Sequence, residues 1–84
     1  MGLYYVTFRS VTHAQRGERI FSGQQIRCNI QRTPRWMEEQ GCGYCLKLWT
    51  EDISRAVGLL QKNRVPLRKV YLQTEDGQLK EMSL

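Results

Sequence analysis

The chain has 84 residues, enough for one small domain with a single hydrophobic core. Hydrophobic residues make up 40% and charged residues 25%, which is typical of a folded globular protein and excludes wholesale disorder. The formal net charge of +5 favours anionic partners without identifying one. No stretch approaches the roughly 20 apolar residues of a membrane span, and residues 1–6 lack a signal-peptide layout, so we expect a cytoplasmic protein without membrane contact.

A strand and a helix are predicted at the start of the chain. Residues 3–8 are rich in β-forming side chains that alternate between two faces, which predicts a strand. The spacing of apolar and small residues then predicts a helix over residues 11–22, with Ser10 or Thr12 as its cap. The pair Ser22-Gly23 is its predicted end.

Residues 26–31 and 44–49 alternate apolar and polar side chains, which predicts the second and third strands. The alternation turns Cys28 toward the core. It turns Cys45 away from the face that carries Leu46.

A second helix is predicted after the third strand. We expect Thr50 to cap it and Glu51 and Asp52 to occupy its first turn, where the helix dipole favours carboxylates. Apolar residues at helical spacing form its buried stripe: Ile53, Ala56, Val57, Leu59 and Leu60.

Residues 70–72 predict a fourth strand, and Asp76-Gly77 is a turn signal that would fold residues 78–82 back as a C-terminal hairpin arm. The resulting order of elements predicts an α+β protein with the ferredoxin-like split βαββαβ plan, in which two helices lie on one face of a four-stranded antiparallel sheet. We therefore assign residues 1–73 to a ferredoxin-like domain and residues 74–84 to a polar hairpin arm or tail.

The loop between the second and third strands carries the candidate chemistry. It runs from Arg32 to Cys45, begins with the basic, proline-containing stretch Arg32-Thr33-Pro34-Arg35, continues through the acidic pair Glu38-Glu39 and delivers the glycine-flanked Cys42 to the third strand. Arginines near a thiol favour the thiolate, which is the reactive form. In a reducing cytoplasm, a Cys-x-x-Cys pair indicates a redox, carrier or metal role rather than a structural disulfide. In the split plan this loop lies at the same end of the sheet as residues 10–13, where a helix N-terminus would stabilise an anion.

Several short motifs together resemble one known family. They are Phe8-Arg9-Ser10, His13-Ala14, Ile26-Arg27, Thr33-Pro34-Arg35 and Cys42-Gly43. Over about residues 4–71 the chain resembles the selenium/sulfur carrier-like family of small bacterial domains, and Thr-Pro-Arg followed by Cys-Gly is the specific part. The resemblance implies a non-enzymatic carrier whose cysteine holds sulfur or selenium as a persulfide or selenenylsulfide. That cysteine maps onto Cys42.

The candidate site combines two thiols with six supporting residues. Cys42 is the candidate carrying thiol. Cys45 is the candidate resolving thiol, which would convert a loaded Cys42 into a disulfide and release the cargo; a packing role for Cys45 is an equal alternative. The residues expected to bind the anion or shape its loop are Ser10, Thr12, His13, Thr33, Arg35 and Gly43. We expect no cofactor, and the expected partners are sulfur or selenium donor and acceptor proteins, with a cysteine desulfurase-like protein as a candidate donor.

Zinc is a weaker interpretation of the same side chains. Cys28, Cys42, Cys45 and His13 would supply a Cys3His set. The second pair lacks the short spacing typical of such sites, and Cys28 alternates with the core. No metal is therefore expected.

The sheet face away from the helices is the last feature that the sequence singles out. Its aromatic and basic residues could form an RNA platform, but the aromatic signature of known RNA-binding sheets is absent, so nucleic acid is not expected. An uncovered aromatic face indicates an interface, and a homodimer formed through a sheet edge or face is a fair expectation. The alternative function is a non-catalytic protein-binding or regulatory module that uses this face and the basic loop. The sequence shows no phosphate-binding loop, no paired carboxylates and no catalytic triad. We therefore expect thiol exchange at most and no other enzymatic activity.

Overall fold

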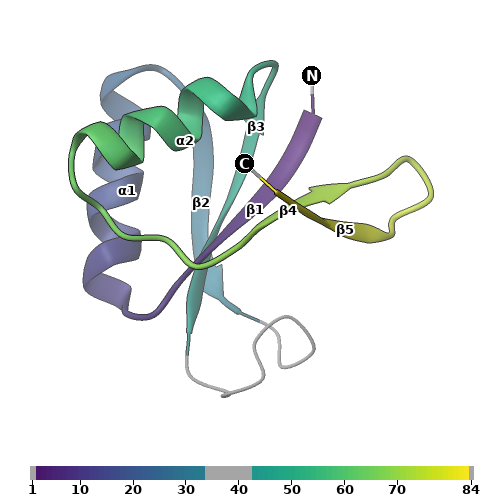
Figure 1. Ribbon diagram of the computed structural model, residues 1–84, viewed down its shortest axis with the longest axis horizontal. Coiled ribbons are helices and arrows are strands. Elements are labelled where there is room, and N and C mark those ends of the chain that lie inside the picture. The colour runs from purple at the N-terminus through teal and green to yellow at the C-terminus, as the bar shows by residue number, and fades with distance from the viewer. Residues whose placement is uncertain (1, 34–42, 84) are drawn as a thin grey trace.

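The computed structural model describes residues 2–33 and 43–83. Two helices and five strands make up this part of the chain (Figure 1). In chain order they are β1 (Gly2–Phe8), α1 (Val11–Gly23), β2 (Arg27–Arg32), β3 (Tyr44–Thr50), α2 (Ile53–Lys62), β4 (Val70–Gln73) and β5 (Leu79–Met82).

The five strands form one antiparallel sheet in the order β2-β3-β1-β4-β5. The predicted α+β class, the antiparallel sheet and the two helices are therefore confirmed. The sheet has five strands rather than four because the hairpin arm returns along β4, with Val70 opposite Met82. Gly77 makes the return possible, since its φ of 86° lies in the left-handed region that favours glycine.

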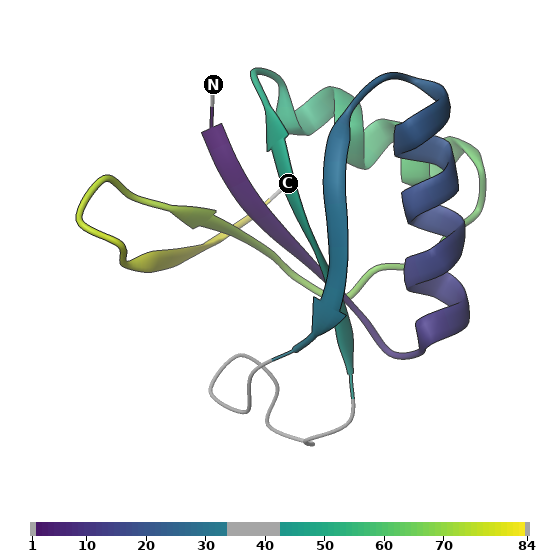
Figure 2. The same cartoon turned by 180° about the vertical axis from the view of Figure 1, so that it is seen from behind.

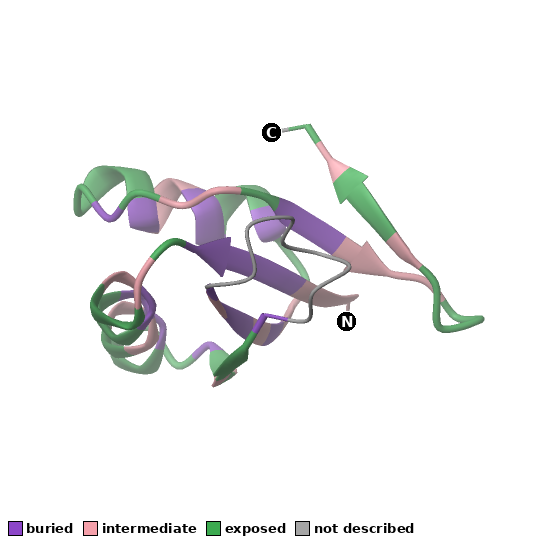
Figure 3. Ribbon diagram, turned by 90° about the horizontal axis from the view of Figure 1, so that it is seen from below, coloured by how far each residue is buried: buried purple, intermediate pink, exposed green. Residues whose placement is uncertain are grey.

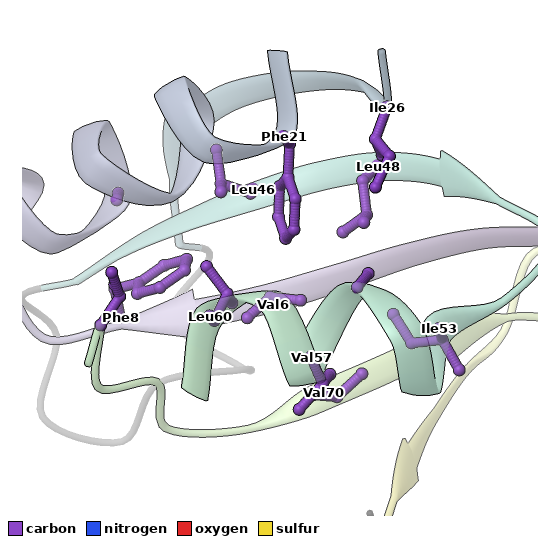
Figure 4. Packing of buried hydrophobic residues seen from close by; sticks show 13 residues of the cluster. Val6, Phe8, Phe21, Ile26, Leu46, Leu48, Ile53, Val57, Leu60 and Val70 are labelled. Carbon is purple, nitrogen blue, oxygen red and sulfur yellow. The ribbon is translucent and has the colours of Figure 1, made fainter. Parts of the chain in front are cut away.

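Both helices lie on the same side of the sheet, and the main hydrophobic core fills the space between the layers (Figure 2). The sheet contributes Val6, Phe8, Leu46, Leu48 and Val70 to this core, and the helices contribute Ala14, Phe21, Ile53, Ala56, Val57 and Leu60 (Figure 4). Buried residues accordingly concentrate on the central strands and on the helix surfaces that face them (Figure 3).

Gly17 allows α1 to approach the sheet closely. A Cβ atom at this position would lie 3.0 Å from Leu46 Cδ1 and 3.3 Å from both Leu60 Cδ2 and the Phe8 ring. Such distances are shorter than ordinary van der Waals contact, so a larger residue here would push neighbouring side chains aside. The glycine thus sets the spacing between α1 and the three elements that it contacts here, β1, β3 and α2.

Helix α1 begins and ends close to the predicted residues. Ser10 is its N-cap, and the Ser10 side chain accepts a hydrogen bond from the His13 backbone N–H at 3.3 Å. The helix continues through Gly23, and the left-handed position that follows belongs to Gln25, with φ of 60°, not to the glycine.

The predicted cap of α2 was wrong by two residues. Asp52 is the N-cap, and its Oδ1 atom accepts a hydrogen bond from the Arg55 backbone N–H at 3.0 Å. Thr50 remains in β3, where its hydroxyl accepts a bond from the Asp52 N–H at 3.1 Å. The hydrogen bond to the threonine hydroxyl stabilises the turn that leads into the helix. Glu51 and Asp52 lie in this turn and precede the helix, instead of occupying its first turn as predicted.

Within the described part of the chain, no helix has the length and apolar character needed to cross a membrane.

Candidate functional site

Three parts of the described chain meet at one end of the sheet. Tyr44, the first residue of β3, pairs with Phe8 at the end of β1 and with Arg32 at the end of β2. The Thr33 backbone N–H donates a hydrogen bond to the Gly43 carbonyl oxygen at 3.0 Å, which holds both flanks of segment 34–42 together. Helix α1 begins three residues after Phe8, at the same end (Figure 1). The predicted proximity of the β2–β3 connection to the start of α1 is therefore confirmed for its flanking residues.

The predicted supporting residues divide between this end of the sheet and the part of the chain that the structure does not describe. Cys42 and Arg35 lie outside the described residues. The other five supporting residues are all placed at this end: Ser10, Thr12, His13, Thr33 and Gly43. The N–H groups of the first helical turn have no acceptor inside the helix, and Ser10 Oγ takes that of His13, so the start of α1 offers an anion its dipole and the N–H groups that precede His13.

A basic pocket opens beside the start of α1. Its volume is about 330 Å³, and its lining residues are Arg9, His13, Pro66, Leu67 and Arg68. The segment between α2 and β4 reaches this position because Thr7 holds it. The Arg68 N–H donates to the Thr7 carbonyl oxygen at 2.8 Å, and the Lys69 N–H donates to Thr7 Oγ1 at 2.9 Å.

Residues 66–68 are the part of this end that the sequence analysis missed. They belong to no helix or strand, and no periodicity points to them. Their position in the sequence could have indicated their place in the fold. They directly precede the fourth strand, which the split plan pairs with the first, and this pairing brings them to the end of β1 where α1 starts.

Cys45 lies on the face of the sheet away from the helices, as the alternation predicted, but it is fully buried there, with an exposed fraction of 0%. It packs in a small second cluster with Tyr5 and Tyr71. Burial raises the pKa of the Cys45 thiol, and hydrogen bonding to Gln31 and Thr33 offsets only part of that rise. A buried, protonated thiol is a poor nucleophile, so this environment favours the packing alternative for Cys45 over the resolving one.

Thr33 is itself buried, with an exposed fraction of 7%. Among the residues that the structure describes, its Oγ1 has no partner that meets the usual geometric limits of a hydrogen bond, so its interaction with the Cys45 sulfur is a weak one. The main structural contribution of Thr33 is the backbone bond to Gly43, which closes the base of segment 34–42.

Cys28 occupies the opposite face of the sheet from Cys45. It is half-buried in β2 and packs against the core between the helices and the sheet. Because the two thiols lie on opposite faces, they cannot ligate one metal ion, and the Cys3His set weighed for zinc cannot form as a whole. Among residues 2–33 and 43–83, no three metal-ligating side chains gather in one place.

The alkylation rate of Cys28 should show the pH dependence of a thiol whose pKa is strongly raised. Burial first, and the nearby Glu18 carboxylate second, raise the pKa of Cys28 from 9.0 to about 11. Because the folded state favours the neutral thiol, its contribution to stability is complete below pH 9 and is lost as the pH rises through 11. We expect the alkylation rate of Cys28 in the folded protein to rise up to about pH 11, and Glu18→Gln to shift that profile to lower pH. A profile that levels off near pH 9 would contradict this assignment.

One of three comparisons with known proteins gave a match. A family model described as "Putative Se/S carrier protein-like" matches residues 3–72, which is most of the chain. Searches of the curated proteins and of the solved structures gave no significant match. The matched region spans β1 to β4 and both helices, and so contains the whole candidate site. The chain therefore belongs to the selenium/sulfur carrier-like family.

Proposed function

We propose that this protein is a carrier that holds sulfur or selenium on Cys42, as a persulfide or selenenylsulfide, and passes it from a donor protein to an acceptor protein. The fold that presents the cysteine is then a ferredoxin-like split βαβ unit with β5 added at one edge. The protein performs thiol exchange and no other catalysis.

The observation that carries the proposal is the environment of the two other thiols. Cys45 is fully buried, and Cys28 has a pKa of about 11. A carrier thiol must ionise near neutral pH and meet the sulfur of another protein. Neither described cysteine meets both requirements, whereas a sulfur or selenium carrier, the role that the family's description suggests, needs a thiol that does. Cys42 is the remaining thiol of the chain.

The charge at this end of the sheet supports the same choice. Arg9, His13 and Arg68 line the pocket beside the start of α1, and Arg32 ends β2 on the flank of segment 34–42. Cations and a helix N-terminus both favour the thiolate over the thiol and the persulfide anion over its protonated form. The end of the sheet at which segment 34–42 begins and ends is therefore rich in positive charge among the described residues.

The proposed transfer consists of two thiol exchanges and involves no net oxidation. The Cys42 thiolate attacks the terminal sulfur of a donor persulfide, so that a new S–S bond forms on Cys42 while the old one breaks and the donor thiolate leaves. An acceptor thiolate then attacks the terminal sulfur on Cys42, and the Cys42 thiolate leaves in turn. Selenium follows the same steps when it replaces the terminal sulfur.

Loading can be tested directly by mass spectrometry. The reduced protein is incubated with a cysteine desulfurase and cysteine, alkylated and digested; a parallel sample receives a selenocysteine-specific lyase and selenocysteine. Trypsin should release residues 36–47 as one peptide containing both Cys42 and Cys45, so fragmentation between Gly43 and Tyr44 assigns the added atom. We expect one extra sulfur or selenium on Cys42. The Cys28 peptide is the internal control and should stay unmodified. An adduct on Cys28 or Cys45, or none at all, would overturn the proposal.

A further inference from the structure

The sheet face away from the helices carries two rows of side chains that cross β2, β3 and β1. We call this surface the open face. In the first row, Arg27 lies beside Trp49, and Trp49 lies beside Leu3. In the second row, Lys47 lies between Asn29 and Tyr5. Strand register therefore places two cations next to two aromatic rings, although the residues come from three separate strands.

The cations on the open face lie within cation–π distance of the aromatic rings. The Arg27 guanidinium carbon lies 4.7 Å from the centroid of the Trp49 ring, and Lys47 Nζ lies 5.4 Å from the same ring. Lys47 Nζ also lies 5.9 Å from the centroid of the Tyr5 ring. Cation–π attraction at these distances orients the charged groups beside the indole rather than leaving them free in solvent.

The open face is positively charged over these three strands. β1, β2 and β3 contain no aspartate or glutamate, and two of their cations, Arg27 and Lys47, lie on this face. On the edge strand β2, the side chains of Arg27, Asn29 and Gln31 are exposed and add amide donors and acceptors to the charge. Trp49 is only partly buried, on the middle strand of the first row, and the mobile ends of the Arg27 and Lys47 side chains are what lies over its ring.

One class of partner matches all of these groups at once. We propose that the open face binds single-stranded nucleic acid, with a base stacked on Trp49 and phosphates paired with Arg27 and Lys47. Base stacking on an aromatic ring combined with a basic groove is the general mode of single-strand binding. An apolar partner would bury both cations without pairing them, and an acidic peptide would pair the cations but leave the indole without a stacking partner. Arg27, Lys47, Tyr5 and Trp49 belong to the RNA platform that the sequence analysis weighed, and nucleic acid was not expected there because the aromatic signature is missing; the cation–π contacts among these residues are what the structure adds.

The test measures binding of a fluorescein-labelled, mixed-sequence 12-nucleotide RNA by anisotropy at low salt and over a salt series. We expect Trp49→Ala to weaken binding by about tenfold, because a base–aromatic stack contributes roughly 1–3 kcal/mol. Trp49→Phe should retain most of the affinity. A Trp36→Phe background leaves Trp49 as the remaining tryptophan, and unlabelled RNA should quench its fluorescence.

A charge-matched pair of variants separates specific contact from general attraction. Arg27→Gln removes a cation from the open face, whereas Arg19→Gln removes one from the exposed side of α1. Arg27→Gln should weaken binding and reduce the slope of log affinity against log salt concentration by about 1, the value for one lost phosphate contact. Arg19→Gln should change neither the affinity nor the slope. Circular dichroism and the thermal midpoint confirm that each variant folds.

Three results would overturn the proposal. The first is an equal effect of the two arginine variants. The second is heparin or duplex RNA binding as tightly as the single strand, with no quenching of Trp49. The third is a dimer that Trp49→Ala dissociates and that RNA does not, which would assign the open face to a second copy of the chain. None of these outcomes affects loading of Cys42, so the two proposals fail independently.

Discussion

Cys42→Ser is expected to reduce transfer of sulfur from a loaded donor to an acceptor thiol to background, a loss of about hundredfold or more. A serine hydroxyl does not ionise near neutral pH and forms no persulfide, so the loading step loses its nucleophile and the second step has no loaded sulfur to pass on. The measurement follows radioactive sulfur from labelled cysteine, through a desulfurase, onto the protein and then onto an acceptor. Transfer is compared with that of the wild-type chain under the same reducing conditions.

Two variants control for the other thiols. Cys28→Ala and Cys45→Ala should each keep the wild-type rate within about twofold, provided that the protein folds, because neither thiol is both ionisable and accessible. If Cys45→Ala loads normally but fails to release its cargo, Cys45 has the resolving role despite its burial. If Cys42→Ser transfers at the wild-type rate, the carrier proposal is wrong.

Phe8→Ala is expected to cost about 3–5 kcal/mol of unfolding free energy, which is a large share of the roughly 5–15 kcal/mol typical of a whole domain. The Phe8 side chain is fully buried, and its ring lies where a Cβ on Gly17 would come within 3.3 Å. Its removal leaves a cavity at the contact between β1 and α1, next to the end of the sheet that carries the candidate site. Urea unfolding followed by circular dichroism measures the change.

Val11→Ala is the matched control for Phe8→Ala. Val11 begins α1 close to the same end of the sheet, but 37% of its surface is exposed. Shortening its side chain therefore leaves no enclosed cavity. We expect a change within about 0.5 kcal/mol, helped by the higher helix propensity of alanine. If both variants lose the same stability, or if Phe8→Ala loses less than about 1 kcal/mol, the core does not depend on the Phe8 ring as described.

Regular elements were predictable because their periodicity is local. The alternation in residues 3–8 and 44–49 follows from which side chains face the helices, and the stripe of α2 follows from the same core. The cap of α2 was less predictable, because Thr50 and Asp52 are both good caps, and only the end of β3 decides between them.

The end of the sheet to which the flanks of segment 34–42 belong was predictable, and the residues around that end were less so. The topology alone brings Thr33 and Gly43 to the start of α1. The basic contribution of Arg68 depends on the hydrogen bonds from residues 68 and 69 to Thr7, which no pattern in that segment encodes. The burial of Cys45 on the open face was also beyond reach, because alternation tells which face a side chain occupies but not what covers it.

The strand order also constrains when the protein can fold during synthesis. β1 and β2 leave the ribosome first, yet they are not neighbours, because β3 lies between them in the sheet. Until β3 has emerged, β1 has no strand to pair with, and α1 has no completed surface on which to bury its apolar side. Nascent chains that end before Thr50 should therefore stay open to proteases and chaperones, and folding should begin only when more than half of the chain has been made.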